Sequence, residues 1–130
     1  MAEDKCICKP TEILIFPCSG GSNVGQIANE AAKNLSTLGH GKMYCLAGIG
    51  GHVSGITELA KTAKKIIAID GCPVSCAKKT LEHAGFKADV HLVVTDLDIQ
   101  KNNDFMMDVD EINKVTESVL EKLKKMRVKK

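Results

Sequence analysis

The sequence of 130 residues is poor in aromatic side chains, with no tryptophan, one tyrosine and three phenylalanines. Proteins that bind single-stranded nucleic acids stack the bases on aromatic rings, and a net charge of only +2 gives little attraction to phosphates. Basic residues do gather near the C-terminus, but in a helical pattern typical of a helix end, where cations interact favourably with the helix dipole. We therefore expect no nucleic-acid partner.

The sequence also lacks any apolar run near the roughly 18 residues that cross a membrane. Its first residues, Met1 to Lys5, carry charges in place of the apolar core of a signal peptide. We expect a cytoplasmic protein without membrane contact. Disulfides are rare in that reducing compartment, so the six cysteines are better explained as metal ligands, reactive thiols or small core side chains.

Short apolar runs alternate with helical patterns, and no linker interrupts them, so residues 1–130 are predicted to form a single α/β domain. The pattern predicts an open, mainly parallel four-stranded sheet with helices on both faces, a three-layer fold of the Rossmann-like or flavodoxin-like kind. A strand order of 2-1-3-4 would place the first three strands side by side, although the sequence does not choose an order. The predicted strands are Ile13–Phe16, Met43–Ala47, Ile66–Ile69 and Val90–Val94.

Local signals predict where the helices begin. Asn23 with Gln26 three residues later resembles a capping box, and Asp108 with Glu111 resembles another. Pro73 suits the first position of a helix, where its missing N–H costs nothing. The residues predicted to face the core are Ile27, Ala28, Ala31, Ala32 and Leu35 in the first helix, Ile56, Leu59, Ala60 and Ala63 in the second, Val74, Ala77 and Leu81 in the third, and Ile112, Val115, Val119 and Met126 in the last.

Three cysteines, Cys18, Cys45 and Cys72, stand at equal intervals, each near the end of an apolar run. The interval is close to one strand-helix-strand unit, so these positions should fall at the same end of a parallel sheet. Cys76 follows Cys72 by about one helical turn, which predicts two sulfurs on one helical face. The sequence thus predicts a four-thiol cluster at the C-terminal edge of the sheet, where ligands bind in such folds.

Four thiolates form a typical tetrahedral zinc site, and we predict one Zn²⁺ bound by Cys18, Cys45, Cys72 and Cys76. Such a site has no position left for water, which argues against hydrolysis. The expected function is metal binding linked to sensing, trafficking or assembly, with a small thiol or soft-element compound as a further candidate ligand. Two alternatives stay open: an Fe–S cluster protein, and a thiol-redox or sulfur-transfer enzyme in which Cys72 or Cys18 is the nucleophile. Whether the protein is an enzyme is left open.

The glycine-rich loops invite comparison with nucleotide-binding motifs. Gly20 and Gly25 have the spacing of the two P-loop glycines, but Gln26 and Ile27 replace the lysine and the hydroxyl residue of that motif. The loop at Gly48 also fails to match the dinucleotide-binding fingerprint. We expect these glycines to serve close approach of the backbone or tight turns, without a nucleotide cofactor.

Other polar residues have less specific predictions. Asp70 either holds a hydrogen bond beside the cluster or caps the next helix, and His52 could act as a ligand or base, although four sulfurs already complete a tetrahedral site. His40, His83 and His91 are predicted to be surface groups. Cys6 and Cys8 form a C-x-C pair in an N-terminal arm, residues 1–12, which could exchange metal, form a redox pair, supply ligands to a partner or be a disordered terminus.

As a set, these motifs resemble the DGC domain family of small prokaryotic proteins, named for a central Asp-Gly-Cys. The segments that carry the resemblance are Pro17-Cys18-Ser19-Gly20, Cys45-Leu46-Ala47-Gly48-Ile49-Gly50-Gly51 and Ile69-Asp70-Gly71-Cys72-Pro73-Val74-Ser75-Cys76-Ala77. The resemblance implies a zinc-binding domain whose four chelating cysteines correspond to Cys18, Cys45, Cys72 and Cys76. It implies no established reaction.

Overall fold

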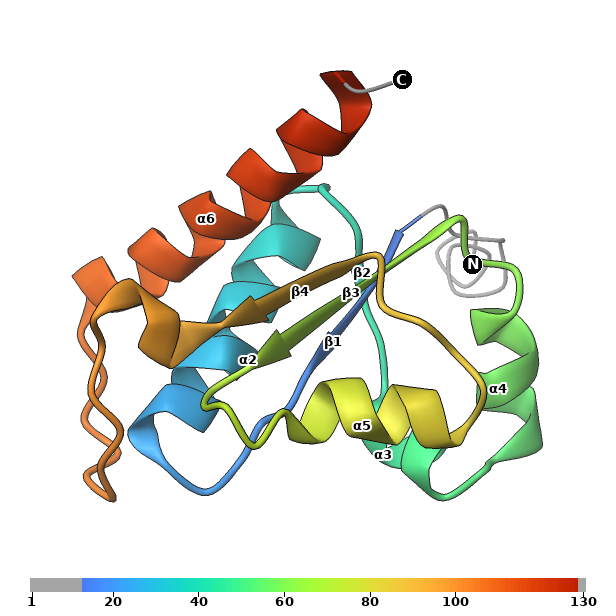
Figure 1. Ribbon diagram of the computed structural model, residues 1–130, viewed down its shortest axis with the longest axis horizontal. Helices are drawn as coiled ribbons and strands as arrows, with labels where there is room; N and C mark the ends of the chain where they lie inside the picture. Colours follow the sequence, from blue (N-terminus) through green and yellow to red (C-terminus); the bar gives the residue numbers. More distant parts are fainter. Residues whose placement is uncertain (1–12, 129–130) are drawn as a thin grey trace, which may run out of the picture.

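The computed structural model describes residues 13–128, and within this range the chain forms a parallel sheet flanked by helices (Figure 1). The four strands lie in the order β2-β1-β3-β4, and all neighbours are parallel. This confirms the predicted α/β class, and the order is the one that places the three cysteine-bearing units side by side. The elements are β1 (Ile13–Pro17), α2 (Asn23–Thr37), β2 (Lys42–Met43), α3 (Leu46–Gly50), α4 (Ser54–Ala60), β3 (Lys65–Asp70), α5 (Cys76–His83), β4 (Val90–Val93), the 3₁₀ helix η1 (Val94–Leu97) and α6 (Val109–Val128).

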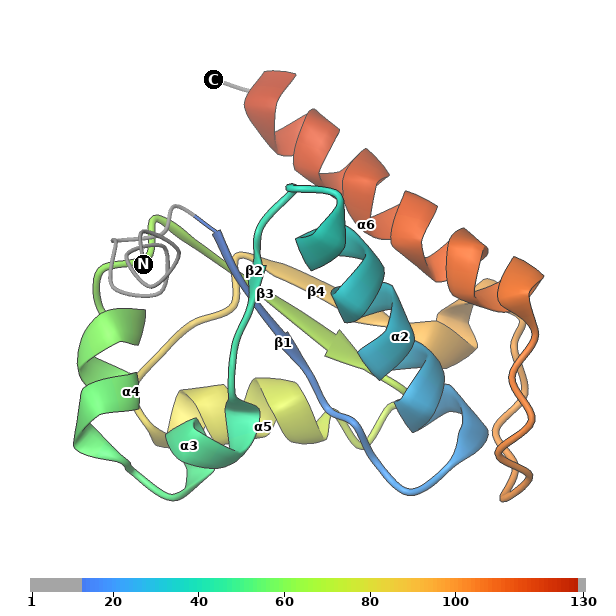
Figure 2. The same ribbon diagram turned by 180° about the vertical axis from the view of Figure 1, so that it is seen from behind.

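The sheet is covered on both faces, because alternate residues of its central strands point to opposite sides. On one face Ile15, Ile67 and Ile69 pack with the buried residues of α2 and α6. On the other, Leu14 and Phe16 pack with residues of α3, α4 and α5. Figures 1 and 2 show these two helical layers on opposite sides of the strands. None of the helices in the described part of the chain is long and apolar enough to span a membrane.

The second strand is shorter than predicted. The run Met43–Ala47 was expected to be a strand, but β2 ends at Met43 and α3 begins at Leu46. The chain leaves the sheet after Tyr44, whose N–H donates to the Ile15 carbonyl at 2.9 Å. Cys45 then caps α3, and its sulfur accepts a hydrogen bond from the Gly48 N–H at 3.3 Å. The helix starts early because a side chain within the predicted strand supplies its cap.

The third βα turn also differs from the prediction. Pro73 does not begin a helix, since α5 starts at Cys76, and Val74 is 55% exposed instead of buried. A turn precedes the helix: the Ser75 N–H donates to the Cys72 carbonyl at 3.1 Å, and Ser75 has a left-handed backbone with φ of 60°. Ala77 and Leu81 are buried, as predicted. The predicted placement of Cys72 and Cys76 on one helical face is therefore wrong.

The first helix also begins differently in detail. Ser22, not Asn23, is the N-cap of α2, and its hydroxyl accepts from the Gly25 N–H at 3.1 Å. The Asn23 side chain instead points to the segment after η1: its amide donates to the Gln100 carbonyl, and its oxygen accepts from the Asn102 N–H. A capping box has no such long-range contacts, so the sequence pattern identified the helix start but the wrong capping residue.

Candidate functional site

Cys18 lies directly after β1, at the point where the chain turns away from β3. Its N–H donates to the Ile69 carbonyl at 2.9 Å, and its sulfur accepts from the Gly71 N–H at 3.4 Å. In the order β2-β1-β3-β4 the connections from β1 and β3 diverge here, which is the topological switch point where open α/β sheets bind ligands. Cys18 is thus held at the functional edge of the fold, as predicted.

The Cys18 thiol is perturbed by its surroundings. Burial raises its pKa above the usual value of a cysteine. The N–H groups of Gly20 and Gly71 donate toward the sulfur and offset part of this rise, because they favour the thiolate. The negative charges of Asp70 and Cys76 raise the pKa further. These influences come from both sides of the switch point.

Three of the four cysteines share one cavity. Cys18, Cys72 and Cys76 line a hollow of about 350 Å³ together with the glycine loop before α2 and the side chain of Lys101. The Lys101 ammonium lies 3.5 Å from the Cys72 sulfur. Lys101 had no sequence signal because it comes from the irregular segment after η1, which only the tertiary fold brings to this edge.

Cys45 lines the neighbouring cavity, of about 500 Å³, and Cys18 lines both. The fold therefore brings all four cysteines to one edge of the sheet, with Cys18 between Cys45 and the pair from the third unit. Cys45 and Cys76 are exposed, so these two are not core fillers. Within residues 13–128 no three His, Cys, Asp or Glu side chains are grouped closely enough to hold a metal ion, so the four-thiolate zinc site stays a prediction.

Close backbone packing explains two glycines of the site. A Cβ on Gly25 would lie 2.5 Å from the Gly20 carbonyl oxygen, and one on Gly71 would lie 2.7 Å from the Gly25 nitrogen. No real Cβ tolerates such contacts, so the loop after β1, the start of α2 and the loop after β3 meet backbone to backbone. The glycine of the Asp-Gly-Cys sequence is required by this contact.

Asp70 is a buried carboxylate, 1% exposed, that caps the cysteine-bearing helix α5 from the end of β3. One oxygen accepts from the Ala77 N–H at 2.6 Å, and the other accepts from the Lys78 N–H at 3.2 Å. Ser75, at the N-cap position, makes no side-chain capping bond. Of the two sequence-based interpretations of Asp70, the capping role is the one that the structure shows.

His91 was predicted to be a surface group, and that prediction is wrong. It lies on β4 next to β3, and its Nε2 is 2.9 Å from an oxygen of Asp70. Its side chain is only 22% exposed. The error has a simple cause: the sequence does not reveal that β4 pairs with β3 in the register that sets His91 beside the Asp70 carboxylate.

Polar groups of the glycine loop before α2 and of the first turn of α2 already have hydrogen-bond partners within the protein. The Gln26 side chain turns back and donates to the carbonyls of Ser19 and Gly20, at 3.3 and 3.0 Å. Two N–H groups of the first turn are also engaged, since Asn23 donates to the Asn102 carbonyl and Gly25 donates to Ser22. Phosphate-binding loops keep such donors for the ligand, so this arrangement does not favour a nucleotide.

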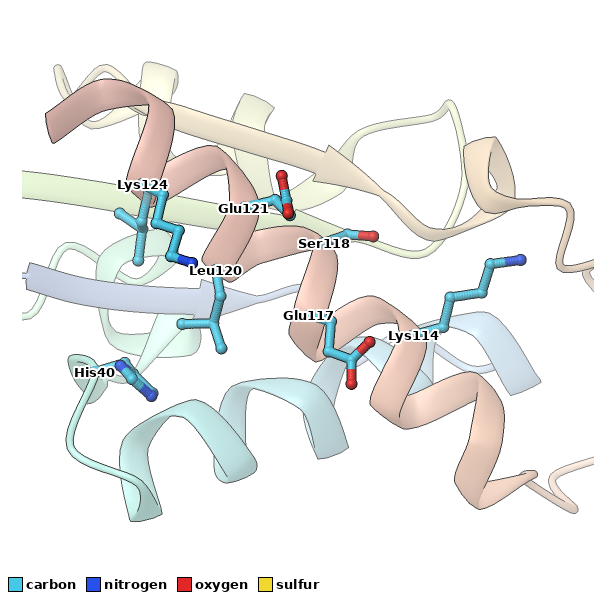
Figure 3. A pocket seen from close by; sticks show the side chains of 8 residues that line it. His40, Lys114, Glu117, Ser118, Leu120, Glu121 and Lys124 are labelled. Carbon is cyan, nitrogen blue, oxygen red and sulfur yellow. The ribbon is translucent and has the colours of Figure 1, made fainter. Parts of the chain in front are cut away.

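The remaining candidate residues are histidines that do not line the cysteine cavities. His52 lines neither cysteine cavity, and its ring lies beside that of His83. His40 faces a hollow of about 530 Å³ whose other side is formed by α6, with Glu117, Leu120 and Lys124 (Figure 3). No cysteine lines this hollow, so it is not a candidate thiol site. Cys6 and Cys8 of the predicted N-terminal arm lie outside the described residues.

Comparison with known proteins agrees with this architecture. The chain is similar to a protein of Pseudomonas aeruginosa named anaerobic and virulence modulator AnvM, with 36% identity over 88 residues that cover 68% of this chain and 67% of AnvM. No solved structure matches the chain. The profile of the DGC domain matches residues 14–119, a range that contains all four site cysteines. The chain therefore belongs to the DGC domain family.

Proposed function

We propose that this protein binds one zinc ion through Cys18, Cys45, Cys72 and Cys76 and that it uses this thiol site in a regulatory role. The observation that carries the proposal is the shared position of Cys18, which lines the cavity of Cys72 and Cys76 as well as that of Cys45. The relative AnvM is named a modulator, which supports regulation over catalysis.

The donors at this edge fit a soft or borderline metal. Among residues 13–128, Asp70 is the only carboxylate that lines the cavity of Cys18, Cys72 and Cys76, and both of its oxygens already accept hydrogen bonds. Sulfur atoms are then the available ligands, and thiolates select zinc or an Fe–S cluster over magnesium or calcium. The Gly71 N–H donates to the Cys18 sulfur and the Gly48 N–H donates to the Cys45 sulfur, as suits thiolate ligands.

A metal analysis and a visible spectrum of protein purified without oxygen test the proposal. We expect colourless protein with about one zinc per chain, the stoichiometry of a single four-thiolate site. Brown protein with iron and labile sulfide would show that the site holds an Fe–S cluster instead of zinc.

Single serine substitutions then test the ligand set. Cys18→Ser, Cys45→Ser, Cys72→Ser and Cys76→Ser should each weaken zinc retention markedly, because the four sulfurs of such a site act as a unit. Cys6→Ser and Cys8→Ser are the matched controls and should retain zinc like the wild type. Zinc retention like that of the wild type in all four site variants would contradict the ligand assignment.

A thiol enzyme is the second candidate, and the contact between Lys101 and Cys72 favours it. A cation beside a partly exposed sulfur is a typical environment of reactive cysteines. In that case the four variants should behave unequally. Cys72 should react fastest with an alkylating reagent, so Cys72→Ser should remove the fast phase of alkylation, while Cys45→Ser should have little effect. Equal effects of the four substitutions on metal retention would favour the zinc site.

A further inference from the structure

Two histidines from distant parts of the sequence, His52 and His83, lie side by side and line neither cysteine cavity. His52 follows α3 and His83 is the last residue of α5. Their ring centroids are 5.4 Å apart and their planes are tilted by 54°. Both residues are exposed, so water and ions reach the rings.

The packing of α3 on α5 holds this pair in place. A Cβ on Gly50 would lie 3.3 Å from the Thr80 methyl group, so the two helices touch one turn before His83. The chain after α3 is a hydrogen-bonded turn in which the His52 N–H donates to the Ile49 carbonyl at 3.1 Å. His52 itself has a left-handed backbone with φ of 56°, a conformation uncommon for a residue other than glycine. The ring of His52 is thus presented to His83 from a rigid turn.

The separation of the rings suits a shared metal ion. An imidazole nitrogen binds zinc at about 2.0–2.1 Å, so the ring centroid lies roughly 3.1 Å from the ion. At a tetrahedral angle, two such rings have centroids roughly 5.1 Å apart. The observed 5.4 Å is close to this value, and exposed side chains can turn either ring nitrogen toward a common point.

We propose that His52 and His83 form a second metal site, which binds an exchangeable divalent transition-metal ion with water in the remaining positions. Imidazole suits Ni²⁺, Cu²⁺ and Zn²⁺, whereas magnesium and calcium prefer oxygen ligands. Neither histidine lines a cysteine cavity, and Cys76 and His83 stand at opposite ends of α5, about 10 Å apart along the helix axis. The proposal therefore does not depend on zinc binding by the cysteines.

Titration of the full-length protein with Ni²⁺ tests this site. Ni²⁺ should bind to the wild type and broaden the ring proton signals of His52 and His83 in NMR spectra before those of the other histidines. His52→Asn and His83→Gln should each weaken this binding by roughly 100-fold or more, because the second imidazole of a pair binds intramolecularly. Asparagine is chosen at position 52 because it tolerates a positive φ.

The controls separate a chelating pair from independent surface groups. His40→Gln should bind Ni²⁺ like the wild type. The loss in the double variant should be much smaller than the sum of the two single losses, since losing one ring already removes the chelating pair. Any nickel taken up by free thiols is the same in all of these proteins, so the difference between them reports the imidazoles. Unchanged binding in His52→Asn and His83→Gln, with thermal unfolding like that of the wild type, would overturn the proposal.

Discussion

At the scale of single residues, the position and the pKa of a site side chain depend on its hydrogen bonds to main-chain groups. Cys18 illustrates this, because its sulfur accepts from the Gly71 N–H while its own N–H is bound to β3. Burial keeps its thiol neutral over a wider pH range than that of a free cysteine. Accessibility also differs between the cysteines, since Cys45 and Cys76 are exposed and Cys18 is only partly so.

This difference predicts the order of alkylation in metal-free protein. Iodoacetamide should modify Cys45 and Cys76 before Cys18 at neutral pH, as followed by mass spectrometry of the labelled peptides. Because the raised pKa leaves Cys18 protonated, its rate should rise about tenfold per pH unit through and beyond the usual thiol pKa of about 8.5. Labelling of Cys18 first at pH 7 would contradict this assignment.

The same shift has a consequence for stability. The folded state prefers the neutral Cys18 thiol, since the pKa in the folded protein lies above that of the unfolded chain. The resulting stabilisation is present below the unfolded pKa and is lost as the pH rises through the folded pKa. Cys18→Ala should flatten this alkaline loss in urea unfolding curves.

At the scale of an element, α5 depends on a residue outside it. Asp70 at the end of β3 takes the role of N-cap, and His91 on β4 holds the same carboxylate. The helix that begins with Cys76 is therefore fastened to the sheet edge by two neighbouring strands. The hydrogen bond from the Ala77 N–H to Asp70 thus fixes Cys76, the first residue of α5, relative to β3, the strand that precedes Cys72.

Removal of this cap should be costly. Asp70→Ala should lower the free energy of unfolding by about 2–4 kcal/mol, because a cap is lost and buried N–H groups are left without a partner. Ser22→Ala removes an ordinary cap and should cost about 1 kcal/mol. Ser75→Gly should cost nothing, since Ser75 makes no capping bond and glycine adopts its left-handed backbone readily. Chemical denaturation measures all three, and equal losses for Asp70→Ala and Ser75→Gly would contradict the capping role.

At the scale of the whole molecule, the described part of the chain has two apolar clusters, one on each face of the sheet. They include completely buried residues such as Phe16, Ile69 and Leu81 that lie outside any metal-binding set. A core of this kind stabilises the chain independently of the cysteine edge. The metal, in our proposal, is an addition to a folded protein.

We therefore expect chelation to leave the fold intact. Protein treated with a chelator and a reductant should keep its far-UV circular dichroism and unfold cooperatively. Added zinc should stabilise it by about 2.7 kcal/mol at a concentration of 100 times the dissociation constant, the amount that mass action requires. Loss of structure upon chelation would show instead that the metal is needed for folding.

Much of this architecture follows from the sequence. Continuous apolar runs such as Ile13–Phe16 and Ile66–Ile69 report burial on both faces, so the parallel sheet and the common edge of the cysteines were predictable. The ends of the strands and helices were harder to predict. Cys45 reads as part of a strand, yet it caps α3, because the choice depends on where the chain leaves its neighbour β1.

What only the tertiary structure decided are the contacts between residues far apart in the chain. The approach of Lys101 to Cys72, the bond between His91 and Asp70 and the pairing of His52 with His83 all depend on strand register and helix packing. Local patterns describe neighbours within one or two turns, whereas these contacts join separate elements. The sequence by itself determined the fold class and the edge that carries the thiols, and packing determined which side chains meet there.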